Sequence, residues 1–271
     1  MIQLIKSLIP VTTLRQLRNI IQIYQAKRLK GNTYYCPYCE LQFSRMLPAG
    51  QNLKIIKEKQ IIGAGFRENA LCPRCYSTDR DRLIYLYLTK KSDIQSKPYK
   101  VLHFAPEKSL KKFLQSFSNI SYQSGDKFMD GYKKAYYDQD VINLDLLDIN
   151  KADESVDIVI CNHVLEHIED DRKAIKELFR ILTPGGWGIL QVPISPIIQT
   201  TLEQKTDSDQ ERENLFGQHD HVRLYGLDYK HRLEEIGFEV EIVDMKIELT
   251  PEEIANFAIN PDEMLYLVRK A

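Results

Sequence analysis

The sequence contains no apolar run of the roughly 18–20 residues that a helix needs to span a bilayer. No apolar stretch near the N-terminus is followed by a small-residue cleavage site, so we expect no secretory signal. Glycine and proline are scarce, with 12 and 11 in 271 residues, and hydrophobic residues make up 43%. This composition excludes collagen-like, low-complexity and disordered chains. Together these absences predict a folded, soluble, cytoplasmic protein.

Acidic residues are few in the first part of the chain. Residues 1–100 contain 18 Lys and Arg against 6 Asp and Glu, a net charge of +12, whereas the remainder contains 19 against 32, or −13. A basic half can meet RNA, an anionic membrane surface or an acidic protein. It can equally dock on the acidic half of the same chain, so both interpretations stay open.

Residues 1–30 contain six basic residues and no acidic ones. After Pro10, apolar residues recur at helical spacing, which predicts a basic amphipathic helix. These residues are Leu14, Leu17, Ile20, Ile21 and Tyr24. We expect such a helix to pack against its own domain, with peripheral contact to a membrane surface as the alternative.

Four of the five cysteines form two Cys-Pro-X-Cys units that are separated by 32 residues. The first unit contains Cys36 and Cys39, and the second contains Cys72 and Cys75. Two thiolates on such a knuckle can both reach one Zn²⁺ at about 2.3 Å, and a second knuckle completes the tetrahedron. Since four thiolates leave no open position, the spacing predicts a structural zinc ribbon at residues 31–95. Cys161 is expected to be a buried small hydrophobe.

From residue 100 onward, short β-rich runs alternate with helical stretches. This alternation predicts an α/β domain at residues 96–271, with a mostly parallel sheet covered by helices on both faces. The expected strands are Lys100–Phe104, Ile120–Ser124, Val141–Leu144, Val156–Cys161, Trp187–Val192, Phe238–Met245 and Met264–Arg269. The expected helices are Glu107–Phe117, Asp170–Leu182, with Asp170 as its N-cap, and Leu227–Ile236.

Ligands of parallel α/β sheets bind outside the carboxyl ends of the strands. Polar or small residues occupy these positions, namely Ala105, Pro106, Glu107, Asp126, Asp145, Asn162 and His163. An acid after the second strand can accept hydrogen bonds from a ribose diol, and one after the third can take an adenine amino group. The ends of the first four strands are therefore the candidate binding site.

The spacing of these acids, with the runs Ser155–Val159, Val164–His167 and Leu178–Gly186, resembles class I S-adenosylmethionine-dependent methyltransferases over residues 100–271. The resemblance implies a Rossmann-like seven-stranded methyltransferase sheet whose last strand is antiparallel. With the two knuckles it extends to a group that has an N-terminal zinc ribbon, over residues 36–240. It implies that S-adenosyl-L-methionine contacts Phe104, Ala105, Pro106, Glu107, Asp126, Asp145, Leu146, Asn162 and His163.

The chain departs from this family at the turn after the first strand. The family usually has a Gly-rich turn there, but this sequence has no glycine between Gly65 and Gly125. Ala105 is small enough to allow close approach of a ligand, whereas Pro106 removes a backbone donor. Glu107 either faces the ammonium group of the cofactor or favours a helix N-terminus, and both interpretations stay open.

The connection Ser195–Tyr225 is longer than the usual 2–6 residues. We expect a lid over the acceptor; the alternative is a charged surface loop in which Arg223 pairs with Asp220. Methyl transfer requires alignment of the acceptor and, where it is protonated, removal of that proton. The candidate catalytic residues are His163 and His221 as bases and Tyr225 as an orienting group, with Glu166 as a possible support for His163.

These observations favour an S-adenosylmethionine-dependent methyltransferase that acts on a small-molecule, glycan or protein acceptor. An RNA base methyltransferase that binds RNA through its basic zinc-ribbon half is the alternative. A hypothesis of another class is a non-catalytic binding module whose glycine-free turn has lost the cofactor.

Overall fold

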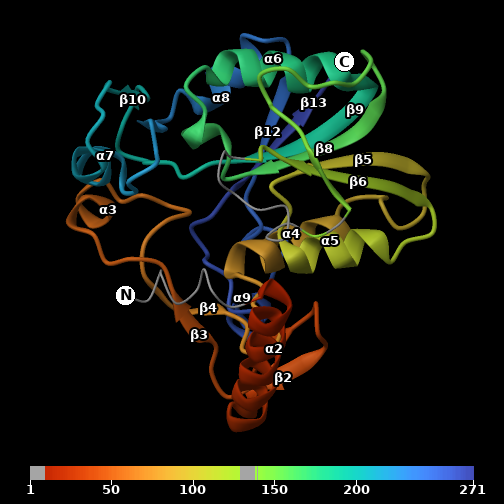
Figure 1. Ribbon diagram of the computed structural model, residues 1–271, viewed down its shortest axis with the longest axis vertical. Helices are drawn as coiled ribbons and strands as arrows, with labels where there is room; N and C mark the ends of the chain where they lie inside the picture. The colour runs from red at the N-terminus through yellow and green to blue at the C-terminus, as the bar shows by residue number, and fades with distance from the viewer. Residues whose placement is uncertain (1–9, 129–137, 139) are drawn as a thin grey trace.

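The computed structural model describes residues 10–128, 138 and 140–271. A large sheet with its helices forms one part of the molecule, and a smaller unit with the N-terminal elements lies beside it (Figure 1). The sheet has seven strands in the order β12-β13-β9-β8-β5-β6-β7. Their bounds are Tyr99–Phe104 (β5), Ile120–Asp126 (β6), Val141–Asn143 (β7), Val156–Asn162 (β8), Leu182–Gln191 (β9), Glu239–Val243 (β12) and Leu265–Arg269 (β13).

One strand of the sheet runs against the others. Strands β5 to β9 pair in parallel, whereas β13 lies antiparallel between β9 and β12. This order and direction confirm the predicted Rossmann-like methyltransferase sheet. All seven predicted strands are present, although β9 begins at Leu182 rather than at Trp187 because the turn residues before Trp187 continue along β8 through a bulge.

The central strands are apolar because both faces of the sheet are covered. In β8, every residue except Asp157 is buried. One face packs against α6 (Asp171–Ile181) and α8 (Tyr229–Glu234), and the other packs against α4 (Asp79–Lys90) and α5 (Lys108–Gln115). The expected α/β layering is thus present.

Local signals set the ends of α6 as predicted. The side chain of Asp170 caps the helix by accepting a hydrogen bond from the backbone N–H of Lys173 at 2.9 Å. The helix ends at Ile181 because Thr183 precedes Pro184, and a residue in that position avoids helical geometry. Asp170 therefore fixes where the chain turns after the short helix η2 (Leu165–His167).

The smaller unit consists of two hairpin-like sheets around the two cysteine knuckles. One sheet pairs β1 (Lys30–Cys36) with β2 (Leu41–Phe43), and the other pairs β3 (Leu47–Ala49) with β4 (Arg67–Leu71). Its own core is small, with Leu29, Phe43 and Met46 packed beside Cys36 and Cys72. A unit with so little core needs a further source of stability, as a bound metal would supply.

Helix α4 links the smaller unit to the sheet. A capping box of Thr78 and Asp81 starts it directly after the second knuckle. Its apolar residues Leu83, Ile84 and Leu88 are buried in the core under the sheet. Because α4 packs on the sheet, this helix joins the smaller unit to the core of the sheet.

Further contacts join the basic part of the chain to the acidic part. The buried guanidinium of Arg82 donates to the backbone carbonyls of Phe257 and Ala258, which follow α9 (Pro251–Asn256). Lys90 pairs with Glu253 at 2.5 Å, and Lys91 pairs with Glu248 at 2.9 Å. The intramolecular docking that the charge asymmetry allows is therefore present.

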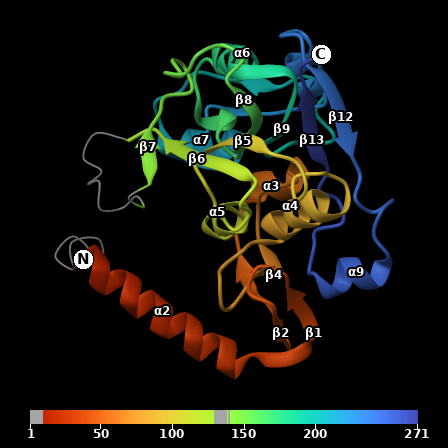
Figure 2. The same ribbon diagram turned by 90° about the vertical axis from the view of Figure 1, so that its right-hand side faces the viewer.

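The predicted N-terminal helix is present as α2 (Val11–Arg28), but its apolar side does not pack on the domain. Ile20 and Tyr24 are 61% and 62% exposed. The helix instead meets the second knuckle through polar groups, since Asn19 bonds to Arg74 and Gln25 to Tyr76. Figure 2 shows α2 extending away from the hairpins below the sheet. In the described part of the chain no helix is both long and apolar enough to cross a membrane.

The long connection after β9 is folded. It forms β10 (Leu202–Glu203), α7 (Asp209–Phe216) and β11 (Arg223–Leu224). Phe216 packs with Ile61 and Leu224, and α7 lies beside α3 (Lys54–Glu58) (Figure 1). This packing favours a bridge to the smaller unit over a lid.

Candidate functional site

A cavity of about 380 Å³ lies at the carboxyl ends of β5 and β8. Ala105, Glu107, Asn162 and His163 contribute to its wall from the sheet side. The opposite side comes from α2, the second knuckle and the start of α4, through Arg18, Gln22, Cys75, Tyr76, Thr78, Arg80 and Asp81. The cavity therefore lies where parallel sheets bind ligands, and the smaller unit closes it.

Two residues on the sheet side of this cavity have left-handed backbone conformations. The φ angles are 45° at Ala105, after β5, and 55° at His163, after β8. Residues other than glycine rarely adopt this conformation, and backbone strain of this kind collects at functional sites. Ala105 thus makes this turn without a glycine, and its amide donates to the carbonyl of Gly125 at 2.8 Å.

The side chain of Glu107 is part of the cavity wall and contacts two polar side chains. One carboxylate oxygen lies 2.7 Å from His103 Nε2, and the other accepts a hydrogen bond from Asn162 Nδ2 at 3.1 Å. Burial opposes ionisation, but the hydrogen bonds from His103 and Asn162 lower the pKa of Glu107 overall. Glu107 occupies the N-cap position of α5 without a side-chain cap bond. The contacts with His103 and Asn162 hold this carboxylate at the cavity wall.

Asn162 leaves an acceptor unused beside this carboxylate. Its side chain is 5% exposed, and Oδ1 has no hydrogen-bond partner among the described residues. A buried acceptor without a partner is costly unless a ligand supplies a donor. Glu107 and Asn162 Oδ1 thus place a carboxylate and an unpaired acceptor side by side in the cavity wall.

The two predicted nucleoside-binding acids lie at the ends of neighbouring strands. Asp126 ends β6, where burial raises its pKa. Asp145 follows β7; its Oδ2 lies 2.7 Å from Lys127 Nζ, and its Oδ1 accepts from the amide of Leu147. Burial by itself would raise the pKa of Asp145, but the hydrogen bond from Lys127 outweighs burial and the pKa is lowered overall.

The other predicted cofactor contacts differ in exposure. Phe104 and Leu146 are buried core residues, and Pro106 is partly buried. In the described structure, Ala105, Glu107, Asn162 and His163 line the cavity, whereas Asp126, Asp145, Phe104, Pro106 and Leu146 are not part of its wall.

His163 pairs with an arginine that the sequence analysis did not single out. Arg80 Nη1 lies 2.6 Å from His163 Nε2 and also donates to the carbonyl of Gly63 at 2.7 Å. Burial, followed by repulsion from Arg80, lowers the pKa of His163 well below its usual value. A neutral imidazole accepts the Arg80 N–H at Nε2, which leaves Nδ1 toward Glu166 Oε1 at 3.4 Å. Arg80 lies in the first turn of α4, directly after the second knuckle. This position is the one feature of the sequence that could have pointed to Arg80 as a site residue.

The other two predicted catalytic residues lie behind the cavity wall. His221 is 4% exposed and packs edge-on against His167, with ring centroids 4.7 Å apart. Tyr225 is fully buried and donates its hydroxyl proton to Asp171 at 2.8 Å. None of the described residues in the cavity wall comes from 195–225. The structure therefore does not bring His221 and Tyr225 together with His163 around one cavity.

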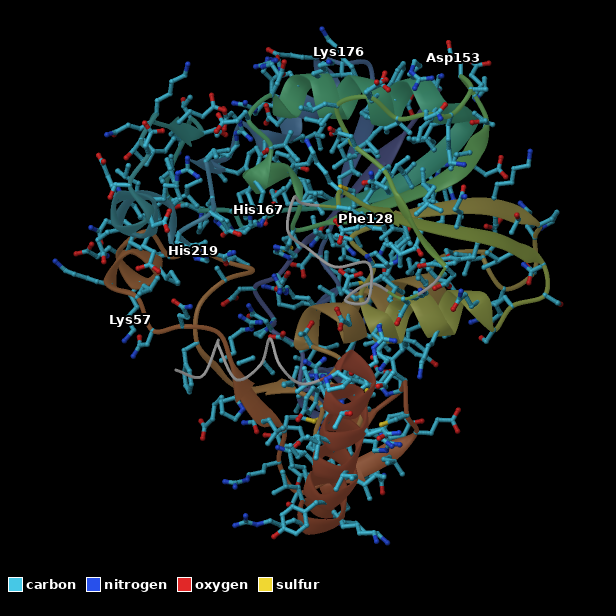
Figure 3. All side chains as sticks on the ribbon, in the orientation of Figure 1. Lys57, Phe128, Asp153, His167, Lys176 and His219 are labelled. Carbon is cyan, nitrogen blue, oxygen red and sulfur yellow. The ribbon has the colours of Figure 1, made fainter. Side chains whose placement is uncertain are left out.

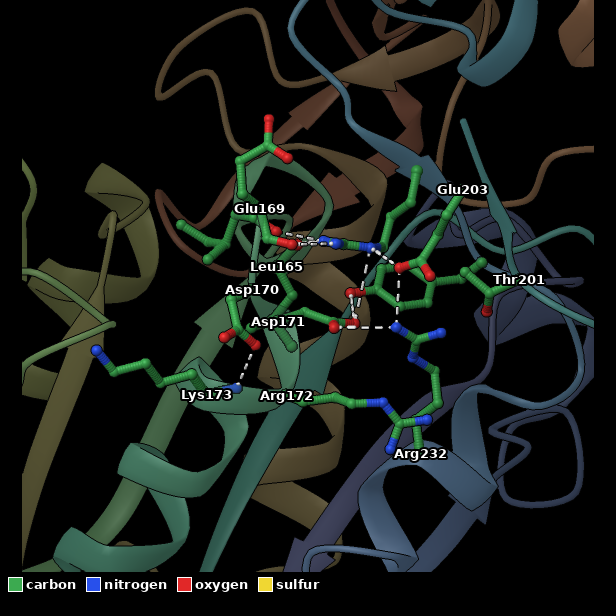
Figure 4. Close-up of polar contacts among 12 residues, drawn as sticks. Leu165, Glu169, Asp170, Asp171, Arg172, Lys173, Thr201, Glu203 and Arg232 are labelled. Atoms are coloured by element: carbon green, nitrogen blue, oxygen red, sulfur yellow. Dashed lines mark hydrogen bonds and ion pairs between the residues drawn. The ribbon is translucent and has the colours of Figure 1, made fainter. Parts of the chain in front are cut away.

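Arg223 belongs to an ion cluster with Asp171, Glu203 and Arg232 rather than to the local pair with Asp220 that the alternative interpretation requires. Figure 4 labels the other three members of this cluster. The guanidinium of Arg223 contacts Glu203 at 2.8 Å and donates to the backbone carbonyls of residues 165, 168 and 169. Arg232 bonds to Asp171 and Glu203, each at 2.9 Å. This cluster holds the loop after β8, which carries His163 and Glu166, against β11.

The four predicted metal ligands meet at one point between the two hairpins. The Sγ atoms of Cys36 and Cys75 are 3.5 Å apart, and those of Cys39 and Cys72 are 3.7 Å apart. Tetrahedral zinc at about 2.3 Å from each sulfur requires S···S distances of about 3.8 Å. The amides of Arg74 and Cys75 donate to Cys72 Sγ. All five cysteines are free thiols, and Cys161 is buried in β8 as expected.

The fold and the cavity define an α/β protein with a cavity at the carboxyl ends of a methyltransferase-type sheet. Residues 101–190, a third of the chain, match a family model described as a methyltransferase domain. No curated protein matches the chain.

Two methyltransferases are among the solved structures that are similar to this chain. An S-adenosylmethionine-dependent methyltransferase from Archaeoglobus fulgidus is 12% identical, with 72% of this chain and 96% of that chain covered and a TM-score of 0.46. Phosphoethanolamine N-methyltransferase 2 of Haemonchus contortus, bound to S-adenosyl-L-methionine, is 14% identical, with 70% and 52% covered and a TM-score of 0.44. Because these sequence identities and TM-scores are low, the fold is assigned from the order and direction of the strands in the sheet.

Proposed function

We propose that the protein is an S-adenosylmethionine-dependent methyltransferase. The observation that carries the proposal is the acceptor pair of Glu107 and Asn162 Oδ1 at the carboxyl ends of β5 and β8. The methionine ammonium of the cofactor supplies the N–H donors and the positive charge that this pair needs. The match of residues 101–190 to a methyltransferase domain supports the same conclusion.

The neighbouring strand ends supply the remaining groups for the cofactor. We assign the ribose hydroxyls to Asp126 and the adenine amino group to Asp145, since carboxylates accept hydrogen bonds from both. Ala105 leaves room beside the turn for the cofactor. When bound, S-adenosyl-L-methionine supplies a methyl group that its sulfonium already activates.

His163 is the candidate base for a protonated acceptor. Its neutral imidazole can take a proton at Nε2 once Arg80 releases that atom. An anionic group on the acceptor would pair with Arg80 and so free Nε2. His221 and Tyr225 act in this proposal through the loop that they support, not on the acceptor.

The charges around the cavity favour an acceptor that carries an anionic group. Arg18, Arg80 and Lys108 line it from three different elements, and no described carboxylate lies within ion-pair distance of any of the three. Burial, together with repulsion from cations that include Arg18, lowers the pKa of Lys108. Because these cations surround one small volume rather than a long groove, we favour a small-molecule or glycan acid over RNA.

We assign a structural Zn²⁺ to Cys36, Cys39, Cys72 and Cys75, with spacings that fit tetrahedral coordination. The metal would fix the second knuckle, from which the chain passes directly into α4 and Arg80. The smaller unit thereby positions a group of the acceptor pocket.

Calorimetric titration tests this function. S-adenosyl-L-methionine and S-adenosylhomocysteine should each bind at one site per chain, and absence of binding would support the non-catalytic module. With S-adenosylhomocysteine bound, inorganic phosphate should bind the wild type and bind Arg18→Gln and Arg80→Gln much more weakly. Unchanged phosphate binding in both variants would contradict the anionic acceptor while leaving cofactor binding as a separate result.

A further inference from the structure

A second cluster of metal-ligating side chains lies behind His163, outside the cysteine site. Glu166, His167 and His221 each offer one ligand atom, and these atoms lie within 4.8 Å of one another. Glu166 and His167 come from η2, and His221 comes from the segment before β11. In Figure 3, His219 lies nearer than His167 to Lys57 of α3.

The carboxylate in this cluster is buried with one oxygen unused. Glu166 is 1% exposed, and its Oε2 has no hydrogen-bond partner among the described residues. Its other oxygen faces His163 Nδ1 at 3.4 Å. A buried carboxylate oxygen without a donor is costly, and a cation is the partner that would satisfy it.

The imidazoles are arranged as metal-binding histidines usually are. His167 Nδ1 lies 3.2 Å from the backbone carbonyl of Asp220, which leaves Nε2 as the free ligand atom. The ring of His221 packs edge-on against that of His167, with the ring centroids 4.7 Å apart. Ligating histidines typically donate their second ring nitrogen to a carbonyl or carboxylate, which fixes the tautomer and the ring orientation.

The backbone around the cluster is held in place. The amide of Val222 donates to the carbonyl of Glu166 at 2.9 Å, which keeps His221 beside Glu166. Arg223 binds the carbonyl of Leu165 at 2.9 Å. Rigid support of this kind is what a preformed metal site requires.

We propose that Glu166, His167 and His221 bind a second divalent transition metal, of which Zn²⁺ is the best match. Two imidazoles and one carboxylate are a recurrent ligand set for zinc, with a fourth position left for water. Tetrahedral zinc needs ligand atoms about 3.4 Å apart, so the longest edge must shorten by at most about 1.4 Å. The metal would join the loop after β8 to the segment before β11, directly behind His163.

Metal content tests this proposal independently of catalysis. The purified full chain is incubated with Zn²⁺, freed of excess metal by gel filtration and analysed by mass spectrometry. The wild type should hold about two zinc ions per chain, one in each cluster. Glu166→Gln, which is nearly isosteric, and His221→Ala should each retain about one, whereas Cys72→Ser should lose the other. Cobalt in the second site should lack thiolate-to-metal charge-transfer absorption, because its ligands are nitrogen and oxygen.

His219→Ala is the matched control, since His219 is exposed and lies two residues from His221. It should keep both metals. Circular dichroism identifies variants that fail to fold, and Glu166→Gln decides the result if His221→Ala is one of them. A wild type with a single zinc that Cys72→Ser removes, or a Glu166→Gln variant that keeps both, would overturn the proposal.

Discussion

Replacing Glu107 with glutamine removes the negative charge that we assign to the cofactor ammonium while keeping nearly the same shape. Glutamine can still accept the hydrogen bond from Asn162, so the wall of the cavity should keep its form. A hydrogen bond to a charged group contributes about 1.5–3 kcal/mol. We therefore expect the dissociation constant of S-adenosyl-L-methionine to rise about 10- to 150-fold.

Isothermal titration calorimetry measures this change, and thermal unfolding of the same samples reports loss of the contact between Glu107 and His103. Glu239→Gln is the matched control, because Glu239 is exposed on β12, away from the cavity wall. Its affinity should equal that of the wild type. If Glu107→Gln binds the cofactor within twofold of the wild type and unfolds at the same temperature, the ammonium lies elsewhere.

Asp126→Ala should weaken binding of S-adenosyl-L-methionine about tenfold or more, because unpaired ribose donors cost roughly 1–3 kcal/mol; wild-type affinity in calorimetry would move the ribose site. Cys72→Ser should lower the zinc content by one equivalent and destabilise the smaller unit, as metal analysis and proteolysis can show; unchanged content would refute the zinc ribbon. Burial raises the pKa of the Glu263 carboxyl group to about 7. The folded state therefore binds the carboxyl proton more tightly than the unfolded state does. The stability that this difference contributes is fully present below about pH 4.3 and is lost as the pH rises to about 7. Glu263→Gln should therefore gain up to about 3 kcal/mol of stability relative to the wild type between pH 5 and pH 8, measured by urea unfolding, and parallel pH profiles would contradict this cause.

Local patterns were sufficient to predict the sheet. The seven strands follow from apolar runs separated by turn signals, and the single antiparallel strand follows from the resemblance. The start of α6 could be read from Asp170 because capping depends on neighbours three residues away. Likewise, the paired spacing of the cysteines placed all four thiols at one point.

Interactions between distant segments could not be predicted in the same way. Arg80 reaches His163 across 83 positions of sequence, and Arg223 reaches Leu165 across 58. The periodicity of α2 predicted an amphipathic helix, but periodicity does not say which side meets the domain. Here the polar side docks through Asn19 and Gln25. The lid was predicted from the length of the segment 195–225 alone. The packing of this segment near α3 depends on distant residues and leaves no local signal in the sequence.

A crystal structure of the protein with S-adenosylhomocysteine tests the central claim most directly. The amino group of the ligand should lie within hydrogen-bond reach of Glu107 and of Asn162 Oδ1, with its ribose on Asp126. A ligand bound away from the carboxyl ends of β5 and β8, or bound there with its amino group turned away from Glu107, would contradict the account.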